Sequence, residues 1–322
     1  MKIVFMGTPE FAVPSLELLH FADPIDVIAV ITQPDRPAGR GNKIQQPPIK
    51  IFANDKLIET FQPEKIREDN NVIDFLKHSN ADAFVTVAFG QILSKEILDI
   101  PRLGTINLHA SLLPKYRGAN PIQWAIINGD STTGVTTMLT EEGVDCGPVL
   151  LRQELPITID DNAIHLTKIM SRIGSRVLLD TLIGLNEGVI KPIPQDHSMA
   201  TKAPKLKKSR GNIKWDHSAW QIHNIIRGTK PWPGAYSYFN NKLIKIHSSY
   251  LPSLSEEKKD FKPGEIKDIT KSTLQVYTGN GYLDITEVQP LNKSVMKAVD
   301  WARGTRIQPG EKFSQEPQLI NN

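Results

Sequence analysis

The first 31 residues, MKIVFMGTPEFAVPSLELLHFADPIDVIAVI (Met1–Ile31), contain a complete strand–helix–strand unit. Lys2–Met6 is a short apolar run, and Asp26–Ile31 is another. Between them, Val13–His20 has apolar residues at helical spacing. Two strands joined by a helix are typical of a parallel sheet with helices packed on it. This opening stretch therefore predicts an α/β fold.

The alternation of strands and helices continues beyond this stretch. Further apolar runs predict strands at Ala83–Phe89, Thr105–Leu108 and Gly134–Leu139. Apolar residues at helical spacing predict helices at Val72–His78, Ile122–Asn128 and Ala163–Asn186. Thr32–Pro48, which is rich in proline, glycine and arginine, is expected to be a long polar loop. We therefore predict a Rossmann-like catalytic domain with a mostly parallel sheet over residues 1–190.

The composition changes after the last of these helices. Residues 191–208 contain several prolines and lysines and little apolar periodicity, which is typical of a linker. A helix is expected at Ala219–Arg227. Short alternating runs separated by turn residues follow it, at Ala235–Phe239, Lys242–Ser248, Gly264–Asp268, Leu274–Tyr277 and Tyr282–Val288. This pattern predicts a small OB-like β-barrel over residues 209–322.

The overall composition is that of an ordinary globular protein. Of the 322 residues, 39% are hydrophobic and 23% are charged, which suits two domains of normal size. The single cysteine, Cys146, excludes an internal disulfide and a multi-cysteine zinc site. No apolar run reaches the ~18 residues that a membrane helix needs, and no signal peptide is visible. We expect a soluble, cytoplasmic monomer with no membrane partner.

The charge is unevenly distributed along the chain. Residues 206–322 carry 18 basic against 11 acidic side chains, whereas residues 1–205 carry 20 against 24. A basic C-terminal third suits a polyanion partner such as a nucleic acid. Lysines on an ordinary solvated surface would give the same count, so charge alone does not decide between the two.

The turn after the first strand argues against one common class of enzyme. Gly7-Thr8-Pro9 stands where a Rossmann fold binds the pyrophosphate of a dinucleotide. The Gly-x-Gly-x-x-Gly pattern of that turn is missing, because only Gly7 is present. A nicotinamide-dependent dehydrogenase is therefore disfavoured.

The densest polar cluster, NLHASLLPKYRG, runs from Asn107 to Gly118. Asn107 and His109 stand two residues apart at the carboxyl end of a predicted strand, so their side chains share one face. Ligands of open α/β sheets bind at this end of the strands. An amide and an imidazole there can stabilise an oxyanion and transfer a proton, although a structural polar pair gives the same pattern.

A second candidate cluster follows the predicted strand Gly134–Leu139. Asp145 stands in a glycine-flanked turn, where its carboxylate could act as a base, orient a histidine, or form an ordinary Asx turn. Cys146 paired with His109 would give a thiol hydrolase. Nothing in the neighbouring sequence activates the thiol, so a packing role is favoured for Cys146.

Taken together, several stretches resemble the folate-dependent formyltransferases. The matching segments are FMGTPEFAVPSL at 5–16, TQPDRPAGRGNK at 32–43, INLHASLLPKYRGANPIQWAIINGD at 106–130 and GVDCGPVL at 143–150. The resemblance extends through the rest of the chain. It implies formyl transfer from 10-formyltetrahydrofolate, with Asn107, His109 and Asp145 at the three catalytic positions of the family.

The resemblance also implies how the donor is bound. The segment of this sequence that matches the family's tetrahydrofolate-binding stretch is Ser111, Leu112, Leu113 and Pro114. No metal is expected, because a neutral amine is already nucleophilic and no cluster of metal ligands is seen in the sequence.

The catalytic positions do not identify the formyl acceptor, because sugar-nucleotide formyltransferases use the same ones. Two basic regions, the loop Pro34–Ile44 and the C-terminal domain, favour a tRNA acceptor. The resemblance implies that this acceptor is initiator methionyl-tRNA, formylated at the methionine α-amine. The expected tRNA contacts are Arg36, Arg40, Lys43, Lys207 and Lys208. A sugar-nucleotide acceptor and a catalytically inactive tRNA-binding protein are the alternatives.

Overall fold

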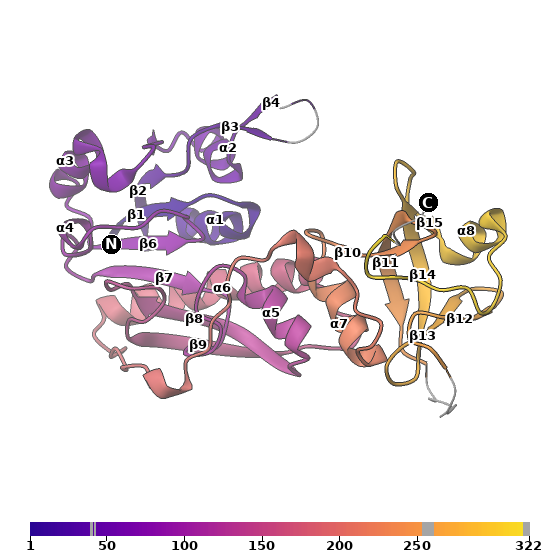
Figure 1. The fold of residues 1–322 in the computed structure, drawn as a ribbon. Helices are drawn as coiled ribbons and strands as arrows, with labels where there is room; N and C mark the ends of the chain where they lie inside the picture. Colours follow the sequence, from indigo (N-terminus) through magenta and orange to yellow (C-terminus); the bar gives the residue numbers. More distant parts are fainter. Residues whose placement is uncertain (39–40, 42, 253–260, 318–322) are drawn as a thin grey trace. The chain divides into compact units, whose positions relative to one another are not determined.

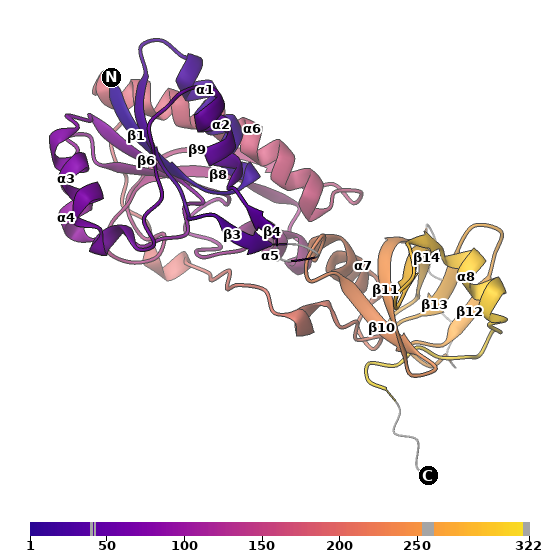
Figure 2. The same ribbon diagram turned by 90° about the horizontal axis from the view of Figure 1, so that it is seen from above.

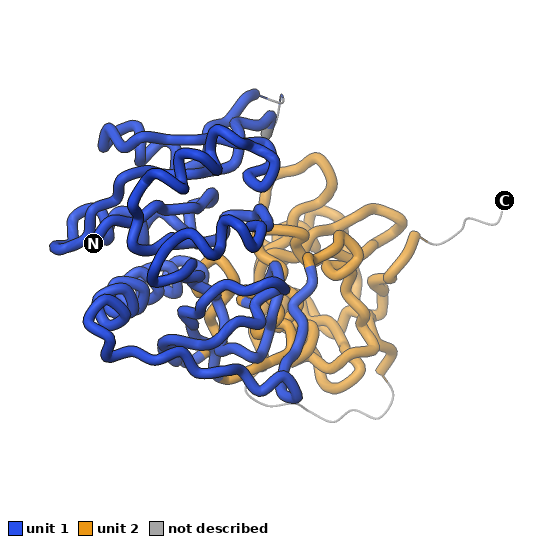
Figure 3. The backbone as a smooth tube through the Cα atoms, turned by 90° about the vertical axis from the view of Figure 1, so that its left-hand side faces the viewer, with its two compact units in different colours: residues 1–121, 132–156, 167–204 blue, residues 122–131, 157–166, 205–322 orange. Residues whose placement is uncertain are grey.

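The chain folds into two compact units (Figure 3). The computed structural model describes residues 1–38, 41, 43–252 and 261–317. Unit 1 comprises residues 1–121, 132–156 and 167–204, and unit 2 comprises residues 122–131, 157–166 and 205–322. Two short segments from the first half of the chain therefore belong to the unit that the C-terminal part builds.

Unit 1 is built on a mostly parallel sheet, which confirms the predicted α/β class (Figure 1). Its seven described strands lie in the order β5-β2-β1-β6-β7-β8-β9. Along the chain they are β1 (Lys2–Gly7), β2 (Asp26–Ile31), β5 (Thr60–Phe61), β6 (Ala83–Val87), β7 (Thr105–His109), β8 (Thr132–Leu139) and β9 (Val149–Pro156). Strands from β5 to β7 run parallel, whereas β8 is antiparallel to both of its neighbours. The carboxyl ends of β1, β6 and β7 thus share one edge.

Helices cover both faces of this sheet. They are α1 (Val13–Phe21), α2 (Pro48–Asp55), α3 (Asn70–His78), α4 (Lys95–Leu98) and α6 (Ala163–Asn186). On one face, Leu76 of α3 and Ile97 of α4 join the same buried cluster as Val4 of β1. On the other, a Cβ placed on Gly174 of α6 would lie only 2.8 Å from Leu108 Cδ2 in β7. Figures 1 and 2 show α6 running along the sheet.

Unit 1 differs from the sequence-based expectation in several stretches, and α2, α4 and β5 are elements that were not predicted. The loop expected at Thr32–Pro48 contains a hairpin, in which β3 (Arg36–Ala38) pairs antiparallel with β4 (Lys43–Gln45). No strand was expected at β9 either. Residues 152–154 of β9 are polar and exposed, so this edge strand lacks the apolar alternation that marks a strand in a sequence. The β3–β4 hairpin also lacks apolar alternation, so the prediction of a loop over the whole of Thr32–Pro48 was wrong.

Unit 2 is built on an antiparallel sheet in the order β10-β11-β14-β13-β12, with β15 paired to β14. Its strands are β10 (Ala235–Phe239), β11 (Lys242–Tyr250), β12 (Ile266–Ile269), β13 (Leu274–Tyr277), β14 (Tyr282–Pro290) and β15 (Met296–Lys297). Its helices are α5 (Pro121–Asn128), of which Pro121 counts in unit 1, α7 (Ala219–Gly228) and α8 (Ala298–Thr305). Short 3-10 turns lie at Glu10–Ala12, Ile66–Glu68, His197–Met199 and Lys208–Gly211.

Residues 310–314 bring the two edges of this sheet together. At the β12 edge, Ile266 donates its N–H to the Glu311 carbonyl and accepts from Gly310 N–H. At the β10 edge, Tyr238 and Ser314 exchange both backbone hydrogen bonds. The side chain between these contacts, Phe313, is fully buried and stacks on Trp215 with ring centroids 5.3 Å apart. The sheet is thereby closed into a small barrel around an aromatic core.

Residues 191–204, the first part of the expected linker 191–208, count in unit 1. Their backbone is hydrogen-bonded to other segments of unit 1 at Ile193, Thr201 and Ala203. Ile193 exchanges hydrogen bonds with Val149 of β9, and Ala203 donates to the Arg117 carbonyl while Arg117 N–H donates to Thr201. This segment therefore lies along the loop that follows β7.

Within the described part of the chain, no helix is both long and apolar enough to span a membrane.

Candidate active site

Asn107 and His109 lie at the carboxyl end of β7, as expected. Parallel pairing places Asn107 opposite Thr86 of β6, and antiparallel pairing places His109 opposite Thr136 of β8. Since side chains alternate along a strand, both point away from the face where α6 packs on Leu108. The imidazole is 6% exposed, and Asn107 is half-buried.

A hydrogen bond from β6 fixes which way the Asn107 amide is turned. The Thr86 hydroxyl donates to Asn107 Oδ1 at 2.9 Å. An amide whose oxygen is engaged on one side presents its NH₂ group as the donor on the other. Thr86 is itself buried, so this bond forms away from bulk water. The contact makes Asn107 an oriented donor at the strand end.

Both ring nitrogens of His109 face defined acceptors. Nε2 lies 2.9 Å from the Tyr116 carbonyl oxygen, and Nδ1 lies 3.5 Å from Asp145 Oδ2. A carbonyl only accepts, so Nε2 carries a proton and donates it to Tyr116. In the neutral ring, Nδ1 is then an unprotonated base beside a carboxylate. When Nδ1 takes up a proton, the ring forms an ion pair with Asp145.

Asp145 is held in place by a turn of unusual backbone geometry. Its φ is +51°, in the left-handed region that costs a residue with a side chain about 1–3 kcal/mol, and Gly143 nearby has φ +122°. The carboxylate accepts the Gly118 N–H through Oδ2 at 2.8 Å. The loop after β7 thus contacts both partners of the pair, His109 through Tyr116 and Asp145 through Gly118.

This arrangement supplies the groups that acyl transfer to an amine requires. An oriented amide N–H₂ can donate to a developing oxyanion. An imidazole nitrogen beside a carboxylate can accept a proton and be stabilised once charged. Asn107 and His109 come from β7, and Asp145 comes from the turn after β8. Because β8 is antiparallel to β7, this turn starts beside the first residues of β7 and folds back along the strand to bring Asp145 to His109.

Comparison with known proteins identifies the family. The formyl transferase family model matches residues 1–182, and the model of the formyl transferase C-terminal domain matches residues 205–306. The chain belongs to the formyl transferase family. It is similar to the methionyl-tRNA formyltransferase of Ruminiclostridium cellulolyticum, with 44% identity over 98% of this chain and 100% of that protein. The methionyl-tRNA formyltransferase of Clostridium tetani is 46% identical over 96% of this chain and 98% of its own length.

Solved structures of formyl transferases share this fold. A sugar 3N-formyl transferase, crystallised in the presence of dTDP and 5-N-formyl-THF, covers 91% of this chain and 99% of its own with a TM-score of 0.64. Its sequence identity of 22% supports the fold alone.

The segment expected to bind folate, Ser111–Pro114, follows His109 directly. Leu113 N–H donates to Thr136 Oγ1 at 3.1 Å, and Thr136 in turn donates to the Ser111 carbonyl at 2.6 Å. The Leu113 side chain packs with Met138 and Val149 in a small buried cluster. β8 therefore fixes the course of this segment beside the catalytic candidates.

Cys146 does not pair with the histidine. Its Sγ donates to the Glu142 carbonyl at 3.5 Å, while the His109 nitrogens face Tyr116 and Asp145. This geometry gives no support to a thiol nucleophile.

The expected tRNA contacts are spread over both units. Arg36 forms an exposed ion pair with Glu64 at 2.8 Å, and Lys43 is exposed on β4. Arg40 lies outside the described residues. Lys207 and Lys208 are exposed in unit 2.

The base of the β3–β4 hairpin is tied to unit 1 by a polar network. Lys50 of α2 donates to Asp35 Oδ2 at 2.7 Å, and Gln62 donates to Asp35 Oδ1 at 2.8 Å. The Gln62 hydrogen bond, followed by that of Lys50, lowers the pKa of Asp35 below its ordinary value. The carboxylate therefore stays ionised and keeps the start of the hairpin in place.

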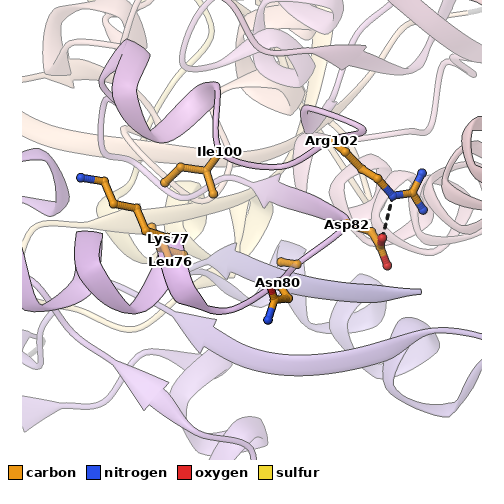
Figure 4. A pocket seen from close by; sticks show the side chains of 7 residues that line it. Leu76, Lys77, Asn80, Asp82, Ile100 and Arg102 are labelled. Atoms are coloured by element: carbon orange, nitrogen blue, oxygen red, sulfur yellow. Dashed lines mark hydrogen bonds and ion pairs between the residues drawn. The ribbon is translucent and has the colours of Figure 1, made fainter.

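A pocket of about 280 Å³ lies at the opposite edge of the unit 1 sheet (Figure 4). Its wall includes Asp82, which precedes β6 and accepts from Lys2 N–H and from Arg102 Nε, both at 2.8 Å. Burial alone would raise the pKa of Asp82, but these two donors outweigh it and lower that pKa. Lys77 at the rim is paired with Glu96 at 2.7 Å. Because Asp82 and Lys77 are both in ion pairs, we assign no chemistry to this pocket.

Among the described residues, no three His, Cys, Asp or Glu side chains gather closely enough to hold a metal ion. Sequence reasoning missed Thr86, whose role depends on strand register and which no local motif marks. Tyr116 and Gly118 stand in the polar cluster Asn107–Gly118, but their backbone contacts depend on the course of the loop and were not predicted.

Proposed function

We propose that the chain transfers the formyl group of 10-formyltetrahydrofolate to the α-amine of methionine on initiator methionyl-tRNA. The observation that carries this proposal is the identity of 44% and 46%, over nearly the whole chain, to two proteins called methionyl-tRNA formyltransferase. The 5-N-formyl-THF present with a solved relative supports a folate donor. Because its proposed substrate is a tRNA, we propose that the enzyme acts in the cytoplasm, and we propose that it acts as a monomer.

In the proposed reaction the neutral amine attacks the formyl carbon. A bond forms between the amine nitrogen and this carbon, and the formyl oxygen becomes an oxyanion in the tetrahedral intermediate. Asn107 Nδ2 donates to that oxyanion, because Thr86 holds its Oδ1 on the other side. The bond from carbon to N10 of the folate then breaks, and N10 takes up a proton.

The His109–Asp145 pair moves the proton that the amine loses. Nδ1 of the neutral ring is the basic position, since Nε2–H is committed to the Tyr116 carbonyl. Protonation of Nδ1 produces an imidazolium that Asp145 Oδ2 stabilises from 3.5 Å. The same proton is then available for the departing N10. The proton of the amine thus passes to the folate leaving group, and no metal takes part in the proposed reaction.

We propose that Ser111–Pro114 contacts the folate, because this segment leads directly out of the catalytic strand. We propose that Arg36, Arg40 and Lys43, with Lys207 and Lys208, contact tRNA phosphates, because basic side chains on exposed segments suit a polyanion. The ion pair of Arg36 with Glu64 is exposed, so exchanging Glu64 for a phosphate costs little.

A formyl-transfer assay tests this proposal directly. The full chain is incubated with 10-formyltetrahydrofolate and, in parallel, with initiator methionyl-tRNA, elongator methionyl-tRNA and a dTDP-amino sugar. We expect rapid formylation of the initiator tRNA only. Turnover of the sugar without tRNA would assign the sugar-nucleotide alternative. Binding of tRNA without any formylation would make the chain an inactive tRNA-binding protein.

The matched loss-of-function control is His109→Ala. Removing the proton-transfer partner should lower kcat by about 10²–10³-fold while the folate still binds. A variant within about threefold of the parent would exclude a direct role of His109.

A further inference from the structure

Gln195 is an unusual residue in its surroundings. Among residues 191–199, all of which the structure describes, it alone has a buried side chain, with 6% exposure. A buried primary amide is costly unless its donors and acceptor are all engaged. The contacts of Gln195 therefore show what holds it in this exposed stretch.

Every polar group of the Gln195 side chain is engaged in unit 1. Its Nε2 donates to the carbonyl oxygens of Asp145 at 3.0 Å and Gly147 at 2.7 Å. Its Oε1 accepts from Arg117 Nε at 3.2 Å and from Arg117 Nη2 at 2.7 Å. The amide thus bridges two loops that are distant in the sequence.

On one side, Gln195 holds the turn that presents the Asp145 carboxylate. This turn needs support, because Asp145 is in the left-handed region at φ +51°. A donor shared by the carbonyls of Asp145 and Gly147 restrains the backbone on both sides of Cys146. Without it, the turn can relax toward an ordinary conformation and carry the carboxylate away from His109.

On the other side, Gln195 holds Arg117 in the loop after β7. The neighbours of Arg117 are the two residues whose backbones contact the pair, Tyr116 at His109 Nε2 and Gly118 at Asp145 Oδ2. One buried amide therefore ties together the two loops that flank the 3.5 Å approach of His109 to Asp145.

We propose that Gln195 is a positioning residue for the His109–Asp145 pair and acts through the backbone of Asp145. It touches neither reacting group in this arrangement. The inference rests on the proposed function, since it assumes that the pair transfers the proton. It assigns a part in the reaction to residues 191–204, which have the composition of a linker.

The first test is Gln195→Met, which keeps the length of the side chain and removes its hydrogen bonds. We expect kcat for formylation of initiator methionyl-tRNA to fall by about 10- to 100-fold, the cost of a misplaced catalytic group. The KM values for the folate and for the tRNA should stay within twofold of the parent, a rough cut-off well below that loss.

Two further variants separate positioning from folding. Asp82→Asn weakens a half-buried polar contact at the opposite edge of the same sheet and should leave kcat unchanged in the folded protein. Gln195→Glu keeps the acceptor for Arg117 but cannot donate to the two carbonyls, so it should be at least as impaired as the Met variant. If Gln195→Met fails to fold by circular dichroism, the Glu variant replaces it in the next experiment.

A double-mutant cycle with Asp145→Asn is decisive. If Gln195 acts through Asp145, its replacement should lower kcat less than twofold, a rough cut-off, once the carboxylate is gone. Full multiplicative losses, or an unchanged kcat in the Gln195 variants, would overturn the positioning role. A fully active Asp145→Asn protein would instead overturn the proposed mechanism itself, so the two failures are distinguishable.

Discussion

The orientation of Asn107 is decided by a single side chain on the neighbouring strand. The amide could present either its oxygen or its NH₂ group to a substrate, and only the NH₂ group can stabilise an oxyanion. In the structure the Thr86 hydroxyl, 2.9 Å from Oδ1, holds the amide with its NH₂ group on the other side.

Thr86→Val should lower kcat by about 5- to 10-fold, because the bond that orients the amide contributes about 1 kcal/mol. Thr86→Ser keeps the hydroxyl and should stay close to the parent. Steady-state formylation with saturating folate and tRNA measures both variants. Equal loss in the Ser and Val variants would show that the methyl group, rather than the hydroxyl, matters at this position.

Asp145→Asn should lower kcat by at least about 10²-fold, since a neutral amide cannot stabilise an imidazolium as the carboxylate does. The neighbouring Cys146→Ser is the matched control and should retain near-parental kcat, because its thiol contacts only the Glu142 carbonyl among its described partners. The reverse result, a dead serine variant beside an active asparagine variant, would require a thiol mechanism.

How much of the site the sequence can predict depends on how far apart its residues are. Asn107 and His109 are two residues apart on one strand, so alternation alone places them on one face. Thr86 stands 21 residues before Asn107 and contacts it from the neighbouring strand. Gln195 stands 50 residues after Asp145 and contacts it from a loop. Neither separation has a local signature, so these supporting contacts could not be predicted.

The same limit applies at the scale of elements. The buried strand β6 is a mostly apolar run and β7 alternates polar and apolar residues, and both were predicted within two residues of their ends. The β3–β4 hairpin, β9 and the closing stretch 310–314 were missed. Their pairing is made by backbone groups of polar, exposed or irregular segments, and backbone hydrogen bonds leave no pattern of side chains.

Helix α7 shows how an element of unit 2 is fixed by polar contacts. Arg227, 5% exposed, donates to the carbonyls of Thr158 and Asp161. His223, 6% exposed, donates from Nε2 to the Ile159 carbonyl at 3.1 Å, so its Nδ1 accepts from the Ser249 hydroxyl at 2.9 Å. These bonds attach the segment 157–162 to α7, within unit 2.

This geometry makes the stability of unit 2 depend on pH through His223. Burial, assisted by the nearby Arg227 charge, lowers the pKa of His223 below its ordinary value. The unfolded chain therefore binds this proton more readily than the folded one. The stability that neutral His223 adds to the folded state is complete above about pH 6.5, the pKa in the unfolded chain. This stability is lost as the pH falls toward the pKa in the folded protein.

His223→Gln should flatten this dependence, because an amide donor does not titrate. Between pH 6.5 and the folded pKa, the free energy of unfolding of the parent falls as the pH falls. We expect that of the variant to fall by up to about 1.4 kcal/mol less per pH unit. All five tryptophans lie in unit 2, so urea unfolding followed by their fluorescence reports this unit. The exposed His78 of α3, changed to Gln, is the control and should leave the curve unchanged.

At the scale of the whole molecule, the units are interleaved in sequence. Ile127, from the segment 122–131, is buried in the same cluster as Ile222 and Ile226 of α7. A chain that ends at Pro204 therefore lacks the packing partners of residues 122–131 and 157–166. We expect this truncated chain to fold its parallel sheet, to bind folate, and to melt at a lower temperature than the full chain. Circular dichroism melts of the two chains test this expectation.

The excess of basic side chains in residues 206–322 predicts a second property of the whole molecule, a salt-dependent affinity for tRNA. Lys207 and Lys208 are exposed at the start of this region. If each contacts a phosphate, the double change to Gln releases about two fewer counterions. The slope of log affinity against log salt should then become shallower by about two units.

The matched control for this change is Lys271→Gln with Lys293→Gln, which removes the same charge from exposed positions elsewhere in unit 2. Filter binding to initiator methionyl-tRNA between about 50 and 200 mM salt measures the slope. If net charge alone attracts the tRNA, both double variants shift the affinity equally. If Lys207 and Lys208 touch the backbone, only their variant changes the slope, and the KM for the folate is the same in both. An altered folate KM with an unchanged slope would place these lysines outside the tRNA interface.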